Sequence, residues 1–169
     1  LPDPPGVKRE AIDKRGLRCR YFANIDKPYL VGDRIETAFR QISRRNPLLR
    51  SQEIATGHIE SAGWLVPSRA GRYTISLDGP HGGRLWIDGH LVIDTTQIET
   101  IDSIDLGRTE VVLGTHPHSI RVETFWNGDV PIPMFVLSWM LPGGDGIPEE
   151  RIPFKYLFPD TSPPAPGVP

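Results

Sequence analysis

Short runs of alternating apolar and polar residues dominate the chain, with glycine, proline, Asn or Asp at their ends. That alternation is typical of half-buried β-strands. In residues 16–22, Leu17, Cys19 and Tyr21 share one side, and arginines occupy the other. Further strands are predicted over 58–66, 72–77, 84–87, 90–93, 108–113, 119–126 and 134–140. Residues 35–42 fit a strand, a short helix or a turn, and these alternatives stay open.

A two-residue turn is predicted at Asp88-Gly89, between the runs 84–87 and 90–93. Asp-Gly between two strands favours a hairpin, because both turn positions require a positive φ. At least seven short strands without a long helix between them indicate an all-β fold. We expect an antiparallel β-sandwich or barrel with at most a short helix. The 17 glycines and 18 prolines agree with a chain of many turns.

The 169 residues suit one domain, and the formal charge of −2 gives no reason to expect nucleic acid as a partner. No stretch approaches the roughly 20 apolar residues of a membrane-spanning helix. Basic residues outnumber acidic ones in 1–50, and the reverse holds in 51–169. The basic excess either meets an anionic surface or pairs with the acidic remainder; the sequence favours pairing, because no aromatic residues are interleaved with the arginines.

Proline-rich segments occur at both ends of the sequence, and such runs favour extended spacers over a packed core. We therefore expect residues 1–15 to form a Pro-rich, basic linker, residues 16–159 the folded domain, and residues 160–169 a second Pro-rich linker. This organisation suggests a module excised from a longer polypeptide, whose other domains would be its partners.

The order of several motifs resembles the protective-antigen-type (PA-fourteen) domain. The most specific motif is the arginine–leucine–aromatic–isoleucine–Asp–Gly run at 84–89. The likeness is carried by 63–67, 70–74, 83–94, 113–117, 120–123 and 137–144. The resemblance implies a β-sandwich module, as found in flocculins and adhesins, as insertions in β-glucosidases, and in bacterial surface proteins and membrane-bound glycosyltransferases. It also implies carbohydrate binding by a module that is usually non-catalytic.

The resemblance breaks down at one position in a loop. Lectin-like members carry two consecutive aspartates there, which bind a calcium ion that holds sugar hydroxyls; here Pro80 and His81 stand in their place. Calcium requires six to eight oxygen ligands, which these two residues do not supply. We therefore expect no metal and no cofactor, and calcium-dependent sugar binding is not favoured. The predicted ligand-binding residues are Asp78, Pro80, His81, Asp94, Trp126, Asn127 and Asp129.

Three other groups of residues suggest chemistry that the sequence favours less. A transition metal would accept imidazoles, and the candidates are His81, His90, His116 and His118. The resemblance implies instead that the histidine of the His116-Pro117 pair closes a loop. Asp88 and Asp94 could be compared with the carboxyl pair of a glycosidase, but a turn and a strand end explain them better. Cys19 is the only cysteine, and its strand position predicts a buried structural thiol.

The aromatic residues offer a way to bind sugar without a metal. Trp86 and Trp126 are candidates for stacking on a sugar ring, since exposed rings beside polar donors recur in ligand sites. We expect Trp86 to fill the sandwich, whereas either location stays open for Trp126.

The sequence thus predicts a protein that is not an enzyme. It is expected to be a glycan-recognition module of a larger exported or membrane-bound protein, with an extracellular or periplasmic location and a glycan as partner. The alternative is a structural or protein-interaction appendage that has lost sugar binding, attached to a glycosyltransferase or another cell-surface protein.

Overall fold

A computed structural model describes residues 15–36, 56–79, 81–96, 107–126, 135–143 and 148–161, without the side chain of Trp126. The elements are β1 (Leu17–Ala23), β2 (Tyr29–Glu36), β3 (Gly57–Leu65), β4 (Gly71–Asp78), β5 (Gly83–Ile87), β6 (His90–Asp94), β7 (Gly107–Leu113), β8 (His118–Trp126), β9 (Val136–Met140), β10 (Glu150–Arg151), the 3-10 helix η1 (Phe154–Tyr156) and β11 (Leu157–Pro159).

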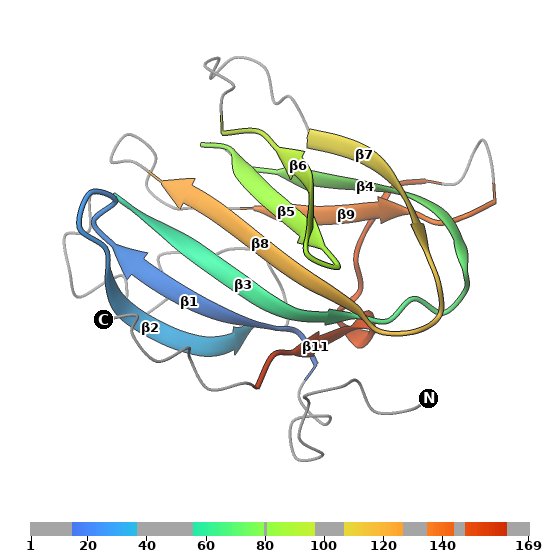
Figure 1. The fold of residues 1–169 in the computed structure, drawn as a ribbon, viewed down its shortest axis with the longest axis horizontal. Coiled ribbons are helices and arrows are strands. Elements are labelled where there is room, and N and C mark those ends of the chain that lie inside the picture. Colours follow the sequence, from blue (N-terminus) through green and yellow to red (C-terminus); the bar gives the residue numbers. More distant parts are fainter. Residues whose placement is uncertain are drawn as a thin grey trace.

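The strands form two antiparallel sheets. The larger has the order β2-β1-β3-β8-β5-β6, with β11 also paired to β3, and the smaller has the order β10-β9-β4-β7. In Figure 1 the larger sheet faces the viewer and the strands of the smaller sheet lie behind it. The predicted all-β sandwich is confirmed. The described residues contain no helical segment with the length and apolarity needed to span a bilayer.

The core lies between the two sheets because alternate residues of each strand point inward. Leu85 and Val122 from the larger sheet and Ile75 and Trp139 from the smaller sheet are fully buried. The Trp139 ring packs 5.1 Å from the ring of Tyr73, centroid to centroid. Its indole N–H donates to Glu150, 3.0 Å away, so the buried ring keeps a hydrogen-bond partner.

Two strands share one edge of β3, and the second of them was not predicted from the sequence. β1 pairs with β3 as far as Ala62, and β11 continues along the same edge from Gly63. A Cβ at Gly63 would lie 2.1 Å from the carbonyl oxygen of Phe158, so only glycine permits this approach. The three residues of β11 are too few to show a periodicity, and the last of them is Pro159.

The undecided segment near residue 35 is a strand as far as it is described. β2 includes Ile35 and ends at Glu36, and residues 37–42 of that prediction lie outside the described residues. The Asp88-Gly89 hairpin is confirmed, with φ of 50° at Asp88 and 77° at Gly89. Both turn residues therefore adopt the left-handed conformation that this kind of turn requires.

We expect two leucines of the β5–β6 hairpin, one buried and one exposed, to contribute very differently to the free energy of unfolding. Leu85→Ala removes a fully buried side chain and should lower the free energy of unfolding by about 2–5 kcal/mol. Leu91→Ala, on the neighbouring strand, removes a side chain that is 50% exposed and should cost about 0.5 kcal/mol. Urea unfolding with an unchanged m-value measures both. Equal losses in the two variants would contradict the packing described above.

Candidate functional site

The predicted loop site lies at one end of the sandwich, where the β4–β5 turn meets the chain that follows β6. Gly82 packs against Thr95 so tightly that a Cβ on Gly82 would lie 2.5 Å from the Thr95 carbonyl oxygen. Thr95 also bonds the main chain of Gly83, since its N–H donates to the Gly83 carbonyl and its Oγ1 accepts the Gly83 N–H. The structure therefore brings the turn containing His81 next to the end of β6, which carries Asp94.

The two predicted aspartates of this region have different surroundings. Burial and the nearby charge of Glu149 raise the pKa of Asp78, which is partly buried at the end of β4. Hydrogen bonds from the hydroxyl and N–H of Thr96, 2.6 and 3.0 Å long, lower the pKa of Asp94. Asp94 also accepts a 3.2 Å hydrogen bond from Arg84. Its carboxylate therefore already holds the strand end together.

The remaining predicted loop residues lie outside the described part of the chain. These are Pro80, Asn127, Asp129 and the side chain of Trp126, whose main chain pairs with Gly57. Their roles stay predictions.

Asp88 and His118 join the β5–β6 turn to the start of β8. One carboxylate oxygen of Asp88 accepts the Ser119 N–H at 2.9 Å, and the other lies 2.6 Å from Nδ1 of His118. Nε2 of His118 accepts the N–H of Gly114 at 3.0 Å, so Nδ1 carries the proton and donates to Asp88. Both ring nitrogens of His118 and both carboxylate oxygens of Asp88 are thus engaged in hydrogen bonds that join the two turns. The ring of His116 packs 4.2 Å from the ring of His118, centroid to centroid.

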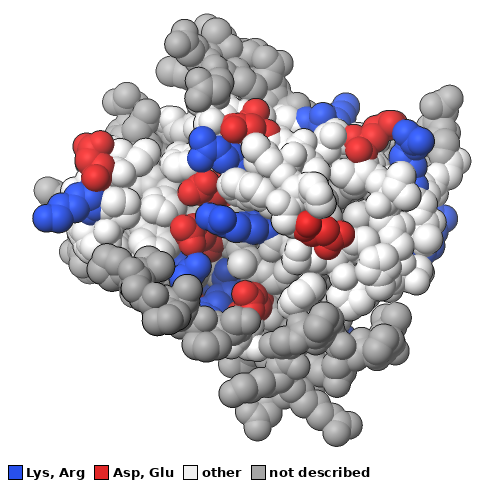
Figure 2. Space-filling model, in the orientation of Figure 1, with Lys and Arg blue, Asp and Glu red and all other residues white. Residues whose placement is uncertain are grey.

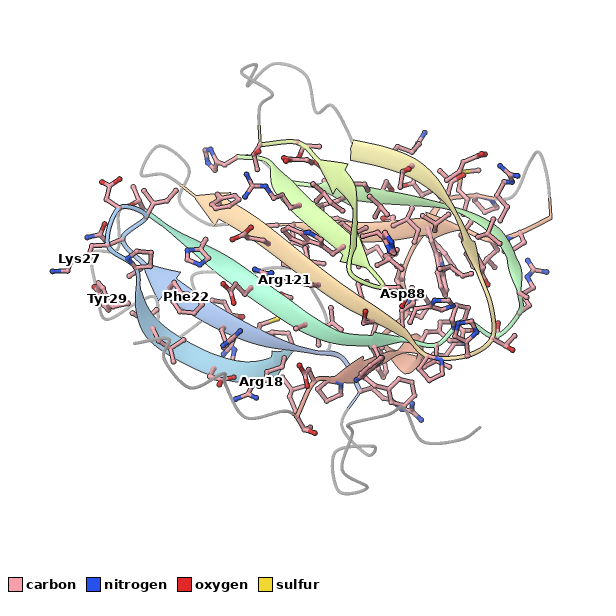
Figure 3. The ribbon with its side chains drawn as sticks, in the orientation of Figure 1. Arg18, Phe22, Lys27, Tyr29, Asp88 and Arg121 are labelled. Atoms are coloured by element: carbon pink, nitrogen blue, oxygen red, sulfur yellow. The ribbon has the colours of Figure 1, made fainter. Side chains whose placement is uncertain are left out.

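A row of charged side chains crosses the outer face of the larger sheet, and Figure 2 shows basic and acidic groups meeting across the centre of this face. In register, the row comprises Asp33, Arg20, Glu60, Glu123, Arg84 and Asp94. Arg20 binds Glu60 at 2.9 Å, and Arg84 contacts Glu123 at 3.4 Å. Arg18, labelled in Figure 3, binds Asp33 through two nitrogens. These arginines of the basic segment are thus paired with acidic residues, as the sequence favours.

Within the described residues, one group of three could hold a metal ion: His58, Glu60 and Glu123, whose ligand atoms lie within 4.8 Å of one another. His58, with Nε2 at 3.7 Å from a Glu60 oxygen, and Arg20 lower the pKa of Glu60. The His58 ring stacks on Phe22 at 4.7 Å. The arginines already balance both carboxylates, so the group is explained as part of the charged row. The four histidines considered for a metal are not members of it.

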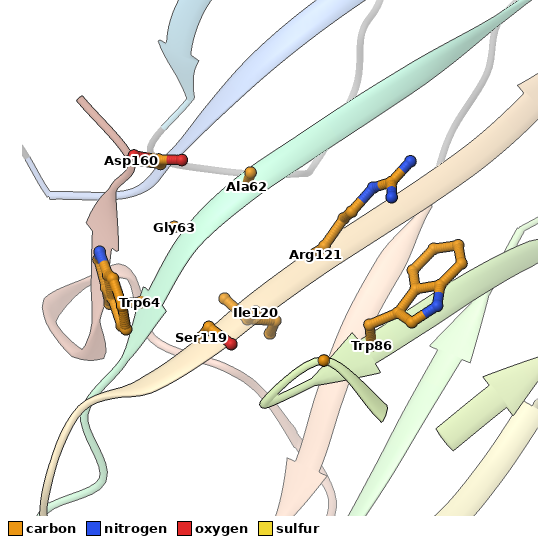
Figure 4. Close-up of a pocket in the computed structure, with 9 residues that line it drawn as sticks. Ala62, Gly63, Trp64, Trp86, Ser119, Ile120, Arg121 and Asp160 are labelled. Carbon is orange, nitrogen blue, oxygen red and sulfur yellow. The ribbon is translucent and has the colours of Figure 1, made fainter. Parts of the chain in front are cut away.

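An open groove of about 430 Å³ lies on the same face of the larger sheet (Figure 4). The short side chains of Ala62 and Ser119 lie between its walls. Trp64 stands on one side, and Trp86 with Arg121 stands on the other. The register explains this arrangement, because Ser119 pairs with Trp64, and Arg121 lies between Ala62 and Trp86. The groove combines apolar rings with hydrogen-bond donors, as small-molecule sites do.

The expectation that Trp86 fills the core is wrong. Leu85 and Ile87 are buried between the sheets, so the strand alternation turns Trp86 to the outer face, where it is partly exposed. The apolar–polar alternation along this strand already indicates the outward direction of Trp86. The same alternation turns Trp64 outward, between the inward-facing Gly63 and Leu65, but Trp64 was not among the predicted site residues.

The predicted buried thiol at Cys19 is confirmed. Its side chain is 1% exposed, and its Sγ lies 3.0 Å from Oγ of Ser61. Burial raises the pKa of Cys19 to about 12. The group therefore stays a protonated thiol at neutral pH and is a poor nucleophile.

The chain matches one protein-family model, and its fold is similar to several solved structures. The model of the PA14 domain matches residues 56–150, more than half of the chain. No curated protein sequence matches the chain. An anti-sigma factor domain-containing protein from Clostridium clariflavum is similar with a TM-score of 0.67 and 23% identity, over 86% of this chain and 47% of that one.

Two other solved structures are described as adhesin domains. A PA14 sugar-binding domain from an RTX adhesin is similar with a TM-score of 0.64 and 15% identity, over 85% of this chain and 98% of that one. The Epithelial Adhesin 6 A domain from Candida glabrata, in complex with Galβ1-3GlcNAc, is similar with a TM-score of 0.61 and 10% identity, over 94% of this chain and 89% of that one. The chain spans about half the length of the Clostridium relative, and at these identities the likeness shows the fold.

We expect Cys19 to resist alkylation until the protein unfolds. A pKa near 12 in place of the usual 9.0 lowers the thiolate fraction roughly a thousandfold, and burial further restricts access. At pH 8, iodoacetamide should modify the native protein at least a hundredfold more slowly than the same protein in 6 M guanidinium, as followed by mass spectrometry. Equal rates in the two conditions would contradict the burial of this residue.

Proposed function

Because this chain belongs to the PA14 domain family, we propose that it is a non-catalytic glycan-recognition module of a larger exported or membrane-bound protein, acting outside the cell or in the periplasm. The family model and the sandwich support the proposal, since PA14 domains often bind sugars in adhesins and glycosidases. The observation that carries it is the groove between Trp64 and Trp86, which offers partly exposed rings beside polar donors.

The surroundings of the candidate nucleophiles and acids support a non-catalytic role. Asp88 is bound to the Ser119 N–H and to His118, and Asp94 is bound to Arg84 and Thr96. A glycosidase uses one carboxyl as a proton donor and a second as a base or nucleophile, both aimed at the scissile bond. Both aspartates are instead used to hold turns and strand ends.

A protein-interaction or structural appendage is the second candidate function, attached to a glycosyltransferase or another cell-surface protein. The observation that favours it is the sequence Pro80-His81, which replaces the two aspartates that hold calcium in lectin-like members. An appendage of this kind would keep the fold without binding sugar.

A glycan array separates the two functions. We expect the labelled chain to bind at least one glycan in millimolar calcium and to keep that binding in EDTA, because the groove needs no bound cation. Nitrophenyl glycosides incubated with the chain should release no nitrophenol.

The same measurements can contradict the proposal in two ways. Absence of binding in both buffers would favour the appendage, and release of nitrophenol would contradict the non-catalytic role. Binding that EDTA abolishes would place the sugar at a calcium loop despite Pro80 and His81.

A further inference from the structure

The two walls of the groove present indole rings to solvent. Trp64 and Trp86 are partly exposed, and neither indole N–H donates to an acceptor among the described residues, whereas that of Trp139 does. A tryptophan with a partly exposed ring and an uncommitted N–H is suited to an amphipathic ligand, since it offers an apolar surface and a donor together. A sugar ring has this dual character, with C–H groups on its faces and hydroxyls at its rim.

Arg121 supplies the directional polar contact. Its guanidinium lies 4.8 Å from the centroid of the Trp86 ring, a cation–π contact that limits its freedom. A carboxylate oxygen of Glu60 is 3.9 Å away, beyond hydrogen-bond distance, and Arg20 already binds that carboxylate at 2.9 Å. The side chain of Arg121 is 50% exposed. The Arg121 side chain makes no hydrogen bond to another described residue, so its N–H groups are available to ligand oxygens beside the groove.

The size and position of the groove agree with a segment of a glycan chain. Its volume of about 430 Å³ falls in the range of roughly 300–1,000 Å³ typical of small-ligand sites. β3 and β5 are separated by β8, so the walls stand about two strand spacings apart, or about 10 Å. Among the described residues the groove is open along a sheet face, a shape that suits a polymer passing across it.

The chemistry of the lining makes a bound cation unnecessary. Asp160 is the one carboxylate among the groove residues, which is far from the six to eight oxygen ligands of calcium. The groove also lies on the sheet face, apart from the β4–β5 turn with His81.

From these contacts we infer that the groove is a metal-independent saccharide-binding site, in which a pyranose unit lies between Trp64 and Trp86 and accepts hydrogen bonds from Arg121. The inference rests on the proposed glycan recognition and names its site.

The test is affinity electrophoresis of the full chain in gels that contain EDTA and either barley β-glucan, galactan or polygalacturonate. We expect retardation in at least one gel. Trp86→Ala and Arg121→Ala should each weaken the affinity for that polysaccharide at least tenfold, as loss of a central Trp or Arg does in other binding sites. Trp64→Ala should do the same.

A second variant keeps all three side chains and fills the space between them. Ala62→Leu adds bulk between the walls on a solvent-facing position, so it should block binding while leaving the melting temperature within a few degrees of the wild type. The matched control is Tyr29→Ala, which removes an aromatic side chain that is 50% exposed. Figure 3 shows Tyr29 by the β1–β2 turn, well away from Arg121, and its loss should leave retardation unchanged.

The outcomes separate this inference from the proposed function. If Trp86→Ala and Ala62→Leu are still retarded in EDTA, the groove is not the binding site, but glycan recognition by the chain stands. Retardation that requires calcium would likewise overturn it and point to the loop end. If the wild type is retarded by none of the three polysaccharides, and the glycan array is also blank, both the groove and the proposed function fail.

Discussion

The pairing of β3 with β8 determines what each face of the larger sheet presents. Nine consecutive pairs run from Gly57 with Trp126 to Leu65 with His118. Because side chains alternate with a period of two, a shift by one residue would turn the whole set of one strand to the opposite face. Burial of Ile59 on the inner side opposes such a shift, since it would expose core residues to water. The constraint that builds the core thus also places Trp64 and Arg121 on the solvent face.

The same register explains why the outer face carries a row of charged side chains beside the groove. Glu60 and Glu123 stand directly opposite each other, and like charges so placed destabilise a sheet unless they are compensated. Arg20 and Arg84 come from the flanking strands and supply that compensation. Two residues along β8 from Glu123, Arg121 pairs in register with Ala62. Its guanidinium lies over the Trp86 ring and 3.9 Å from a carboxylate oxygen of Glu60. Exposed ion pairs contribute only about 0–1 kcal/mol each, so their main effect here is to orient side chains.

The sequence was informative where the signal is local and uninformative where distant segments meet. Alternation and the Asp88-Gly89 turn predicted most strands, because each depends on neighbouring residues alone. β11 was missed, since three residues ending in proline show no period. Even the outward direction of Trp86 could have been predicted, but its position next to Arg121 could not. That contact joins residues far apart in the chain, and it depends on a pairing register that no single segment specifies.

The two regions considered for a ligand differ in what would set their specificity. At the loop end, Pro80 and His81 stand where the resemblance implies carboxylates, and Asp94 is already bound to Arg84 and Thr96. On the sheet face, the strand spacing holds the walls at a nearly constant separation, so little ordering would oppose binding. Specificity there would depend on the residues between the walls, at positions 62 and 119, more than on loop length. The proposed binding surface on the sheet face would therefore depend on the register of β3, β8 and β5 and not on the loops.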